Sequence, residues 1–301
     1  MDTRVIPKDE FNLGAWSAER LQRVERALEA WVGVDAPAGL GEAMRYAVLD
    51  GGKRLRPLLV LAASEAVGGN GQAALRAACA VELIHAYSLV HDDMPCMDND
   101  VLRRGKPTVH VKYGEAGALL AGDALQALAF ELLTPQDDGV PEAMQARLCR
   151  LLAHAAGSAG MAGGQAIDLA SVGVKLNEDQ LRQMHRLKTG ALLQASVLMG
   201  AATGGADVAA SLGDYGAAIG LAFQVVDDIL DVTADSATLG KTAGKDAEQD
   251  KPTYVSILGL ERSRAYAHEL HAQALAALQA SGLADTRALR ALADMVVNRA
   301  S

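Results

Sequence analysis

The sequence has little of what marks β-sheet, disulfide-bonded or nucleic-acid-binding proteins. Aromatic residues make up only 4% of the 301 residues, β-branched runs are scarce, and no two strand-like segments are joined by a turn signal. The three cysteines, Cys79, Cys96 and Cys149, lack C-x-x-C spacing, which argues against a zinc site or disulfide framework and fits a reducing cytoplasm. The net charge of −9 argues against a nucleic-acid partner.

Long apolar runs and targeting segments are also missing. No stretch reaches the roughly 18 uninterrupted apolar residues of a membrane span, so we expect none. Charged residues such as Arg4 and Lys8 come early and no apolar h-region follows, which argues against a signal peptide. We expect residues 1–12 to lack fixed structure and the chain, 1–301, to form one cytoplasmic domain.

Alanine and leucine dominate instead, and 50% of the residues are hydrophobic, which predicts an all-α fold with a large core. A polar segment, 235–250, should form a loop between helices. Periodicity and Gly/Pro breaks predict about a dozen helices, over 16–32, 39–50, 57–68, 72–94, 112–133, 141–160, 178–188, 190–203, 206–233, 252–259, 261–281 and 285–299.

Two aspartate clusters stand at the ends of apolar, Ala- and Leu-rich runs. The first holds Asp92, Asp93 and Asp98, and the second holds Asp227, Asp228 and Asp231. Core helices avoid ionised carboxylates, because burying an unpaired charge is costly. We therefore expect the clusters to face each other and share Mg²⁺, which is usually held by carboxylates and substrate phosphates. The alternative for the second cluster is a solvated acidic face.

Spacing within each cluster predicts its geometry. Residues three and four apart share a helix face, so the three aspartates of the second cluster should lie together with Gln224. In the first cluster, Pro95 should stop the helix near Asp93 and let the chain bring Asp98 back towards Asp92. An ordinary helix C-terminal turn is the alternative, but the basic run 103–106 follows directly.

Basic residues supply candidate anion sites. Lys53 and Arg56 follow Gly51-Gly52 and can converge on one anion, unless this segment is simply a solvated turn. His85 lies two helical turns before the first cluster, along the line of the carboxylates. Lys188 precedes Thr189 in an apolar helical region, where a lone lysine usually extends its charge to solvent.

Taken together, these motifs resemble the trans-isoprenyl diphosphate synthases over nearly the whole chain, and the Pro95-Cys96 insertion resembles bacterial farnesyl diphosphate synthases and plant-type geranylgeranyl diphosphate synthases. The matching segments occur in the family's order: 51–57, 84–85, 92–105, 163–168, 188–189 and 224–231. The resemblance implies antiparallel helices around a central cavity and a homodimer. It also implies a prenyltransferase reaction, in which an allylic diphosphate (dimethylallyl or geranyl) ionises, alkylates isopentenyl diphosphate and loses a proton.

The same resemblance implies a role for each residue. The metal site, with about three Mg²⁺ ions or Mn²⁺ in their place, would comprise Asp92, Asp93, Asp98, Asp227, Asp228 and Asp231. The allylic diphosphate would be bound by Arg103, Lys188 and Lys241, with Lys251 assisting closure. The catalytic set would be Lys188, Thr189, Gln224 and Arg103, with Thr189 and Gln224 beside the ionising carbon. Isopentenyl diphosphate would be bound without metal by Lys53, Arg56, His85 and Arg104.

Product length should depend on Tyr87 and Ser88, one turn before the first cluster. A ring at Tyr87 should block chain growth and favour the C15 product, farnesyl diphosphate, over C20. The alternatives are a C10 or C20 synthase, a class I terpene cyclase, which needs no second cationic site, and a silent subunit, which would be expected to lose aspartates. A di-iron bundle is set aside because only one Glu-x-x-His pair, Glu82 with His85, is present.

Overall fold

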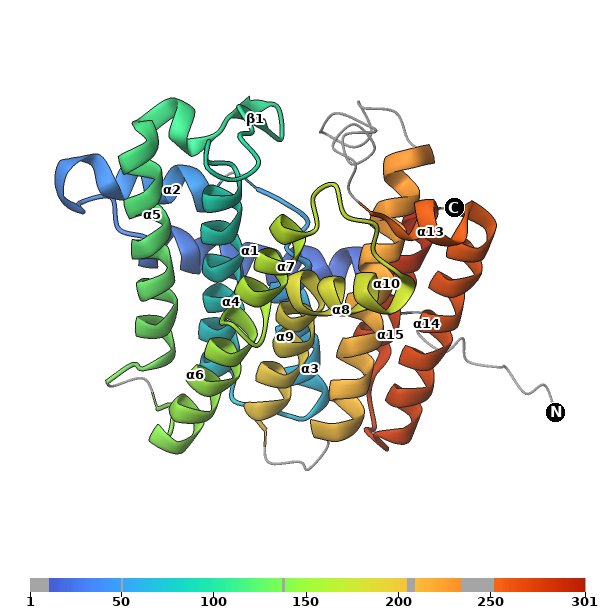
Figure 1. Cartoon of the computed structure of the whole chain (residues 1–301). Helices are drawn as coiled ribbons and strands as arrows, with labels where there is room; N and C mark the ends of the chain where they lie inside the picture. Colours follow the sequence, from blue (N-terminus) through green and yellow to red (C-terminus); the bar gives the residue numbers. More distant parts are fainter. Residues whose placement is uncertain (1–10, 50, 137–138, 205–208, 234–251, 301) are drawn as a thin grey trace.

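The computed structural model describes residues 11–49, 51–136, 139–204, 209–233 and 252–300, and it is all-α, as predicted (Figure 1). The helices are α1 (Leu13–Trp31), α2 (Leu40–Val48), α3 (Leu55–Ala66), α4 (Gly71–Asp92), α5 (Val109–Leu133), α6 (Glu142–Ala156), α7 (Met161–Ala170), α8 (Glu178–His185), α9 (Ala191–Ala202), α10 (Ala209–Thr233), α13 (Tyr254–Leu258), α14 (Leu260–Ala280) and α15 (Arg287–Val297). Short elements are η1 (Pro37–Gly39), β1 (Leu102–Arg103), β2 (Lys106–Pro107), η2 (Arg186–Gly190) and η3 (Asn298–Ala300).

The hydrophobic core has two parts. One surrounds α4, and the other surrounds α10, which packs against α9 and α14. Helices α3 and α9 contact each other and contribute to both parts. Both α4 and α10 are buried along much of their length, as expected of helices that are apolar on most sides.

The ends of α4 and α10 bring the two aspartate clusters to one end of the molecule. Asn70 begins α4 by accepting hydrogen bonds from the backbone of Gln72 and Ala73, both at 3.0 Å. The helix ends at Asp92, ahead of Pro95, as predicted. In Figure 1 the C-terminal ends of α4 and α10 both lie at the top of the view.

Three local expectations were wrong. The helix expected over 141–160 ends at Ala156, because a glycine-containing turn intervenes before α7. Helix α7 itself was not expected. Neither was the hairpin of β1 and β2, whose two turn residues, Arg104 and Gly105, both have positive φ (52° and 76°). Such a two-residue turn matches the twist of paired strands.

Other expectations lie outside the described residues or stay predictions. Lys241, Lys251 and the loop 235–250 are not described, and neither are residues 1–10. Asn12 is described and caps α1 by accepting from the backbone of Ala15 at 2.9 Å. By length and composition alone, the described helices α4, α5 and α10 could cross a membrane. The absence of a membrane span and the single domain over 1–301 therefore stay predictions.

Candidate active site

The first aspartate cluster lies in a tight turn after α4. The backbone N–H of Asp98 donates to the carbonyl of Asp92 at 2.9 Å, and that of Asp100 donates to the carbonyl of Asp93 at 3.1 Å. Asn99 permits the reversal by taking a left-handed conformation with φ 51°. The predicted return of Asp98 towards Asp92 is therefore confirmed.

Asp93 and Arg103 form an ion pair between this turn and the hairpin. The guanidinium donates through Nε and Nη2, at 2.6 to 3.0 Å, to a carboxylate that is almost fully buried. Paired donors of this kind fix orientation as well as charge. Asp93 thus fixes the orientation of Arg103, whose charge lies close enough to act on Asp92.

Asp92 differs from Asp93 in having no hydrogen-bond donor among the described residues. Burial raises the pKa of the Asp92 carboxyl to about 6, against the nearby positive charge of Lys188, while Asp98 adds to the rise. A largely buried carboxylate without a protein donor is a suitable oxygen ligand for a hard cation.

The second cluster lies on α10 and is held by groups from α10, α13 and η3. The carboxylate of Asp228 accepts from Gln224 Nε2 at 2.8 Å and from the backbone N–H of Tyr254 at 2.7 Å. Asp227 pairs with Arg299 at 3.2 Å, and Asp231 is buried one turn later. Asp228 is therefore placed to orient Gln224 and the start of α13.

A π-turn, η2, carries Lys188 and Thr189 where α8 meets α9. Single π-turns inside helices often occur at functional sites. Lys188 Nζ lies 2.5 Å from Asp168 Oδ2 on α7, and Thr189 Oγ1 donates to Gln224 Oε1 at 3.1 Å. A Cβ on Gly164 of α7 would lie 2.1 Å from the backbone nitrogen of Lys188, so glycine is needed for this approach.

The four residues expected to bind an anion without metal lie close together. Burial lowers the pKa of His85 well below its usual range, and Arg56 and Arg104 lower it further. His85 is therefore neutral near pH 7. Arg56 Nε is buried without a hydrogen-bond partner among the described residues. Burial also lowers the pKa of Lys53, and the charge of Asp227 opposes that change, which places the second cluster near this set.

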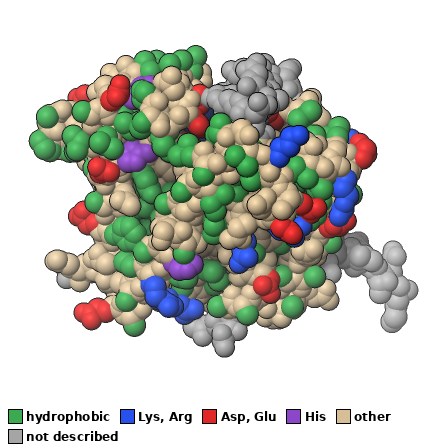
Figure 2. All heavy atoms as spheres, viewed as in Figure 1, with side chains coloured by type: hydrophobic (Ala, Val, Ile, Leu, Met, Phe, Trp, Pro, Cys, Tyr) green, Lys and Arg blue, Asp and Glu red, His purple; other side chains and the backbone are tan. Residues whose placement is uncertain are grey.

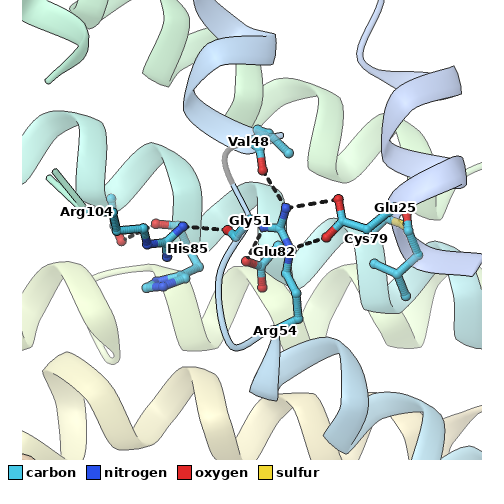
Figure 3. A network of polar contacts seen from close by, with 10 residues as sticks. Glu25, Val48, Gly51, Arg54, Cys79, Glu82, His85 and Arg104 are labelled. Carbon is cyan, nitrogen blue, oxygen red and sulfur yellow. Dashed lines mark hydrogen bonds and ion pairs between the residues drawn. The ribbon is translucent and has the colours of Figure 1, made fainter. Parts of the chain in front are cut away.

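The turn of the hairpin brings Arg104 to this anion site. Its guanidinium donates to the carbonyl of Gly51 (Figure 3). Gly52 has φ 133°, and a Cβ there would lie 2.9 Å from Arg104 Nη2. Both glycines of the Gly51-Gly52 pair therefore serve the contact between the loop before α3 and the hairpin.

One cavity of about 380 Å³ joins these parts. Its lining includes Arg56, His85, Tyr87, Ser88, Asp92, Lys188 and Thr189, together with apolar side chains of α7. Asp92 of the first cluster, the π-turn and part of the anion site therefore face the same space. The predicted site residues that do not line it are Lys53, Asp93, Asp98, Arg103, Arg104, Gln224 and the second cluster.

The described residues supply only some of the ligands that a metal ion would need. Among the residues that the structure describes, no three His, Cys, Asp or Glu side chains are grouped closely enough to hold an ion. Mg²⁺ commonly takes only one or two carboxylates and completes its shell with water and substrate phosphates. The donor set around Asp92 fits that pattern.

Several structural partners were not recognised from the sequence. Arg54 lies between two predicted anion ligands, yet its side chain is turned away from them and is buried against Glu25 and Glu82. Glu82, a lone acid in an apolar run, was a usable indication of a buried cation. Arg299 and Tyr254 hold the second cluster from distant parts of the chain, and the sequence gives no indication of either contact.

Comparison with known proteins gives one family. The polyprenyl synthetase family model matches residues 37–291. Heterodimeric geranylgeranyl pyrophosphate synthase large subunit 1 of Arabidopsis thaliana is 49% identical, over 88% of this chain and 73% of that protein. An FPP/GFPP synthase from Zymomonas mobilis is 42% identical with a TM-score of 0.83, covering 95% of this chain and 99% of that one. Geranyltransferase from Helicobacter pylori, complexed with magnesium and isoprenyl diphosphate, is 35% identical with a TM-score of 0.82, covering 96% and 98%.

The close packing of α7 on η2 can be tested at Gly164. We expect Gly164→Ala to displace η2, because its methyl group would overlap the backbone of Lys188. The melting temperature of the wild-type protein should rise when Mg²⁺ and inorganic pyrophosphate are added, and this rise should be largely lost in the variant. Gly33→Ala is the control, since a Cβ there meets nothing within 4 Å. An undiminished response in Gly164→Ala would contradict the role given to this contact.

Proposed function

The chain belongs to the polyprenyl synthetase family, and we propose that this prenyl-transferring enzyme condenses isopentenyl diphosphate with dimethylallyl or geranyl diphosphate to give (E,E)-farnesyl diphosphate. One observation carries the proposal: a single cavity is lined both by Asp92 with Lys188 and by Arg56 with His85. The first pair suits a metal-bound diphosphate, and the second suits a diphosphate bound without metal.

The allylic diphosphate would lie between the first cluster and η2. Its C–O bond breaks with the electron pair leaving on the diphosphate, and Arg103 and Lys188 bring positive charge to that anion. Thr189 donates its hydroxyl hydrogen to Gln224, so its oxygen lone pairs remain available to the cavity. That oxygen can stabilise the positive charge that develops on the allylic carbon.

Asp92 and Asp98 would hold Mg²⁺ with the diphosphate, and the second cluster would approach from α10. When bound, Mg²⁺ supplies positive charge that stabilises the leaving diphosphate. The Helicobacter pylori geranyltransferase complexed with magnesium and isoprenyl diphosphate supports the choice of magnesium. Three ions, and Mn²⁺ in place of Mg²⁺, remain part of the proposal, as do the roles of Lys241 and Lys251.

Isopentenyl diphosphate would bind to Lys53, Arg56, Arg104 and neutral His85. The unpartnered Nε of Arg56 is a donor that such an anion can satisfy. The double bond of the bound substrate then lies in the same cavity as the allylic cation. The apolar walls exclude water, which would otherwise trap the cation.

Two observations bear differently on product length. Tyr87 lines the cavity, and its ring meets the ring of His91 edge-on, with centroids 5.6 Å apart. His91, on α4, is held against α5 by a 3.1 Å hydrogen bond between its Nε2 and the carbonyl of Leu119. This held ring favours a C15 product. The C20 product, geranylgeranyl diphosphate, is the second candidate, and the name of the Arabidopsis thaliana relative favours it.

The proposal predicts metal-dependent chain elongation by the purified protein. With isopentenyl diphosphate, geranyl diphosphate and Mg²⁺, we expect C15 products, measured by chromatography after dephosphorylation. EDTA should abolish the reaction. Asp92→Asn should lower kcat/KM on the order of 10²- to 10³-fold, because it removes charge at the leaving group.

The assay separates the rival activities. A C20 product would retain the chemistry and discard the C15 assignment. Release of diphosphate from the allylic substrate alone, without consumption of isopentenyl diphosphate, would indicate a terpene cyclase and overturn the proposal. Complete inactivity with either starter would favour a silent subunit.

Product length can be tested at Tyr87. We expect Tyr87→Ala to shift the main product to C20 or longer, because removing the ring opens space below the growing chain. Tyr266→Ala, on α14, removes an equal ring away from the cavity and should leave the length unchanged. The same product distribution in both variants and the wild type would remove Tyr87 from the cavity floor.

We also propose a homodimer through α5. Leu119 and Leu120 on this helix are 46% and 56% exposed, and Val111 is 50% exposed. In the most apolar 18-residue stretch of α5, only 39% of the stretch is buried within the chain. The corresponding stretch of α4 is 67% buried. Figure 2 shows hydrophobic side chains over the α5 end, at the left of the view. An exposed apolar face of this kind marks an interaction site.

The dimer predicts that a charge on α5 lowers the mass in solution. We expect Leu120→Glu to elute as a monomer in size-exclusion chromatography with light scattering, whereas wild type elutes as a dimer. Val174→Glu is a matched control, because Val174 is 51% exposed and lies on the segment between α7 and α8, which Figure 1 shows apart from α5. A monomeric wild type would refute the homodimer.

A cytoplasmic location is the last part of the proposal. All three cysteines are free, and Cys96 is exposed. Free thiols fit a reducing compartment. The proposed substrates are small diphosphates, and the net charge of −9 argues against nucleic acid as a partner.

A further inference from the structure

A buried arginine lies directly behind the proposed isopentenyl diphosphate site. The Arg54 side chain is only 3% exposed, and its guanidinium makes four contacts (Figure 3). It donates to the two carboxylate oxygens of Glu25 at 2.7 and 3.2 Å, to Glu82 at 2.7 Å and to the carbonyl of Val48 at 2.6 Å. These partners belong to α1, α4 and the end of α2, so one side chain joins three helices.

The backbone of Arg54 is as unusual as its side chain. It has φ 45° and ψ 34°, the left-handed conformation, and it forms the N-cap of α3. Such a conformation is unfavourable for a residue that carries a β-carbon. The buried contacts of the guanidinium hold the residue there. As a result the loop turns Arg54 into the core, while Lys53 is exposed and Arg56 lines the cavity.

Glu82 places a negative charge among several positive ones. Its side chain is 4% exposed and lies one helical turn before His85 on α4. Burial lowers the pKa of both Arg56 and Arg104, and the charge of Glu82 is the largest opposing influence on each. Neither arginine forms an ion pair with a carboxylate among the described residues. Glu82 therefore stabilises a group of cations whose remaining counter-ion must come from a ligand.

We infer that Arg54 and Glu82 are positioning residues for isopentenyl diphosphate, acting through Lys53, Arg56 and Arg104 without touching the substrate. The inference rests on the proposed function, because it assigns these three cations to that substrate. Arg54 fixes the loop that carries Lys53 and Arg56. Glu82 holds Arg54 and offsets the repulsion that would otherwise push Arg56 and Arg104 apart. The allylic site, built on Asp93, Asp168 and η2, does not depend on this pair.

This independence gives the test. Glu82→Gln keeps the size and one hydrogen-bond acceptor but removes the charge. Arg54→Lys keeps the charge but loses the planar fork that holds two glutamates. In both variants we expect KM for isopentenyl diphosphate to rise about tenfold while KM for geranyl diphosphate stays within about twofold.

A matched control separates positioning from stability. Arg45 also ties helices together, donating to the carbonyls of Glu29 and Val32 at 2.8 and 2.6 Å. Among the described residues it has no carboxylate partner, and it lies outside the cavity. Arg45→Gln should lower the melting temperature and leave the ratio of the two KM values unchanged. If Glu82→Gln and Arg54→Lys behave like Arg45→Gln, their role is structural only and the inference is overturned.

A binding measurement keeps the test independent of turnover. Titration calorimetry of isopentenyl diphosphate in EDTA measures the metal-free site directly. Wild type should bind, and Glu82→Gln should bind about tenfold more weakly. Equal binding by both would refute the positioning role and leave the proposed function standing. Absence of binding to wild type would refute the proposed substrate site, and the inference with it.

Discussion

The structure depends on one constraint: charged side chains must lie at the ends of apolar helices without leaving a buried charge unpaired. Breaking a buried ion pair by removing one partner costs about 3–5 kcal/mol. Three buried or half-buried pairs meet this constraint: Arg54 with Glu82, Asp93 with Arg103 and Lys188 with Asp168. These pairs fix the helices around the cavity and leave only selected charges facing it.

The pairs also sort the charged residues into two groups. Asp93, Asp168 and Glu82 are occupied by protein cations and orient them. Asp92 and Arg56 face the cavity without an ion-pair partner among the described residues. The first group supports the second. Residues of the same type, adjacent in the sequence, thus have different roles, and the difference follows from which helix lies opposite each of them.

Sequence reasoning predicted the parts that depend on local chemistry. Pro95 correctly predicted the end of α4 and the return of Asp98, because proline restricts the residues before it wherever it stands. The all-α class followed from composition and periodicity. The first cluster and the cations around His85 were expected, and Arg56, His85 and Asp92 do line one cavity.

The remaining features depend on long-range packing. Nothing near Arg54 distinguishes it from Arg56, and only the positions of α1 and α4 decide which one is buried. In the sequence, Asp228 cannot be distinguished from Asp227 and Asp231. In the structure it differs because the backbone N–H of Tyr254, far along the chain, donates to it. The hairpin was not predicted because each of its strands is only two residues long. Its turn also requires Arg104 to adopt a positive φ, a conformation that usually indicates glycine.

The π-turn has a consequence for the amphipathic pattern of the chain. An α-helix advances about 100° per residue, so the extra residue in η2 rotates α9 by roughly that angle relative to a straight continuation of α8. Helices α8 and α9 are consecutive in the chain, yet they can direct their apolar faces at different neighbours. Helix α8 contacts α7, and α9 contacts α3. Lys188 and Thr189 stand at the joint. Their directions are set by a phase shift in the backbone, so a single-residue deletion there would regularise the helix and turn Lys188 and Thr189 away from the cavity.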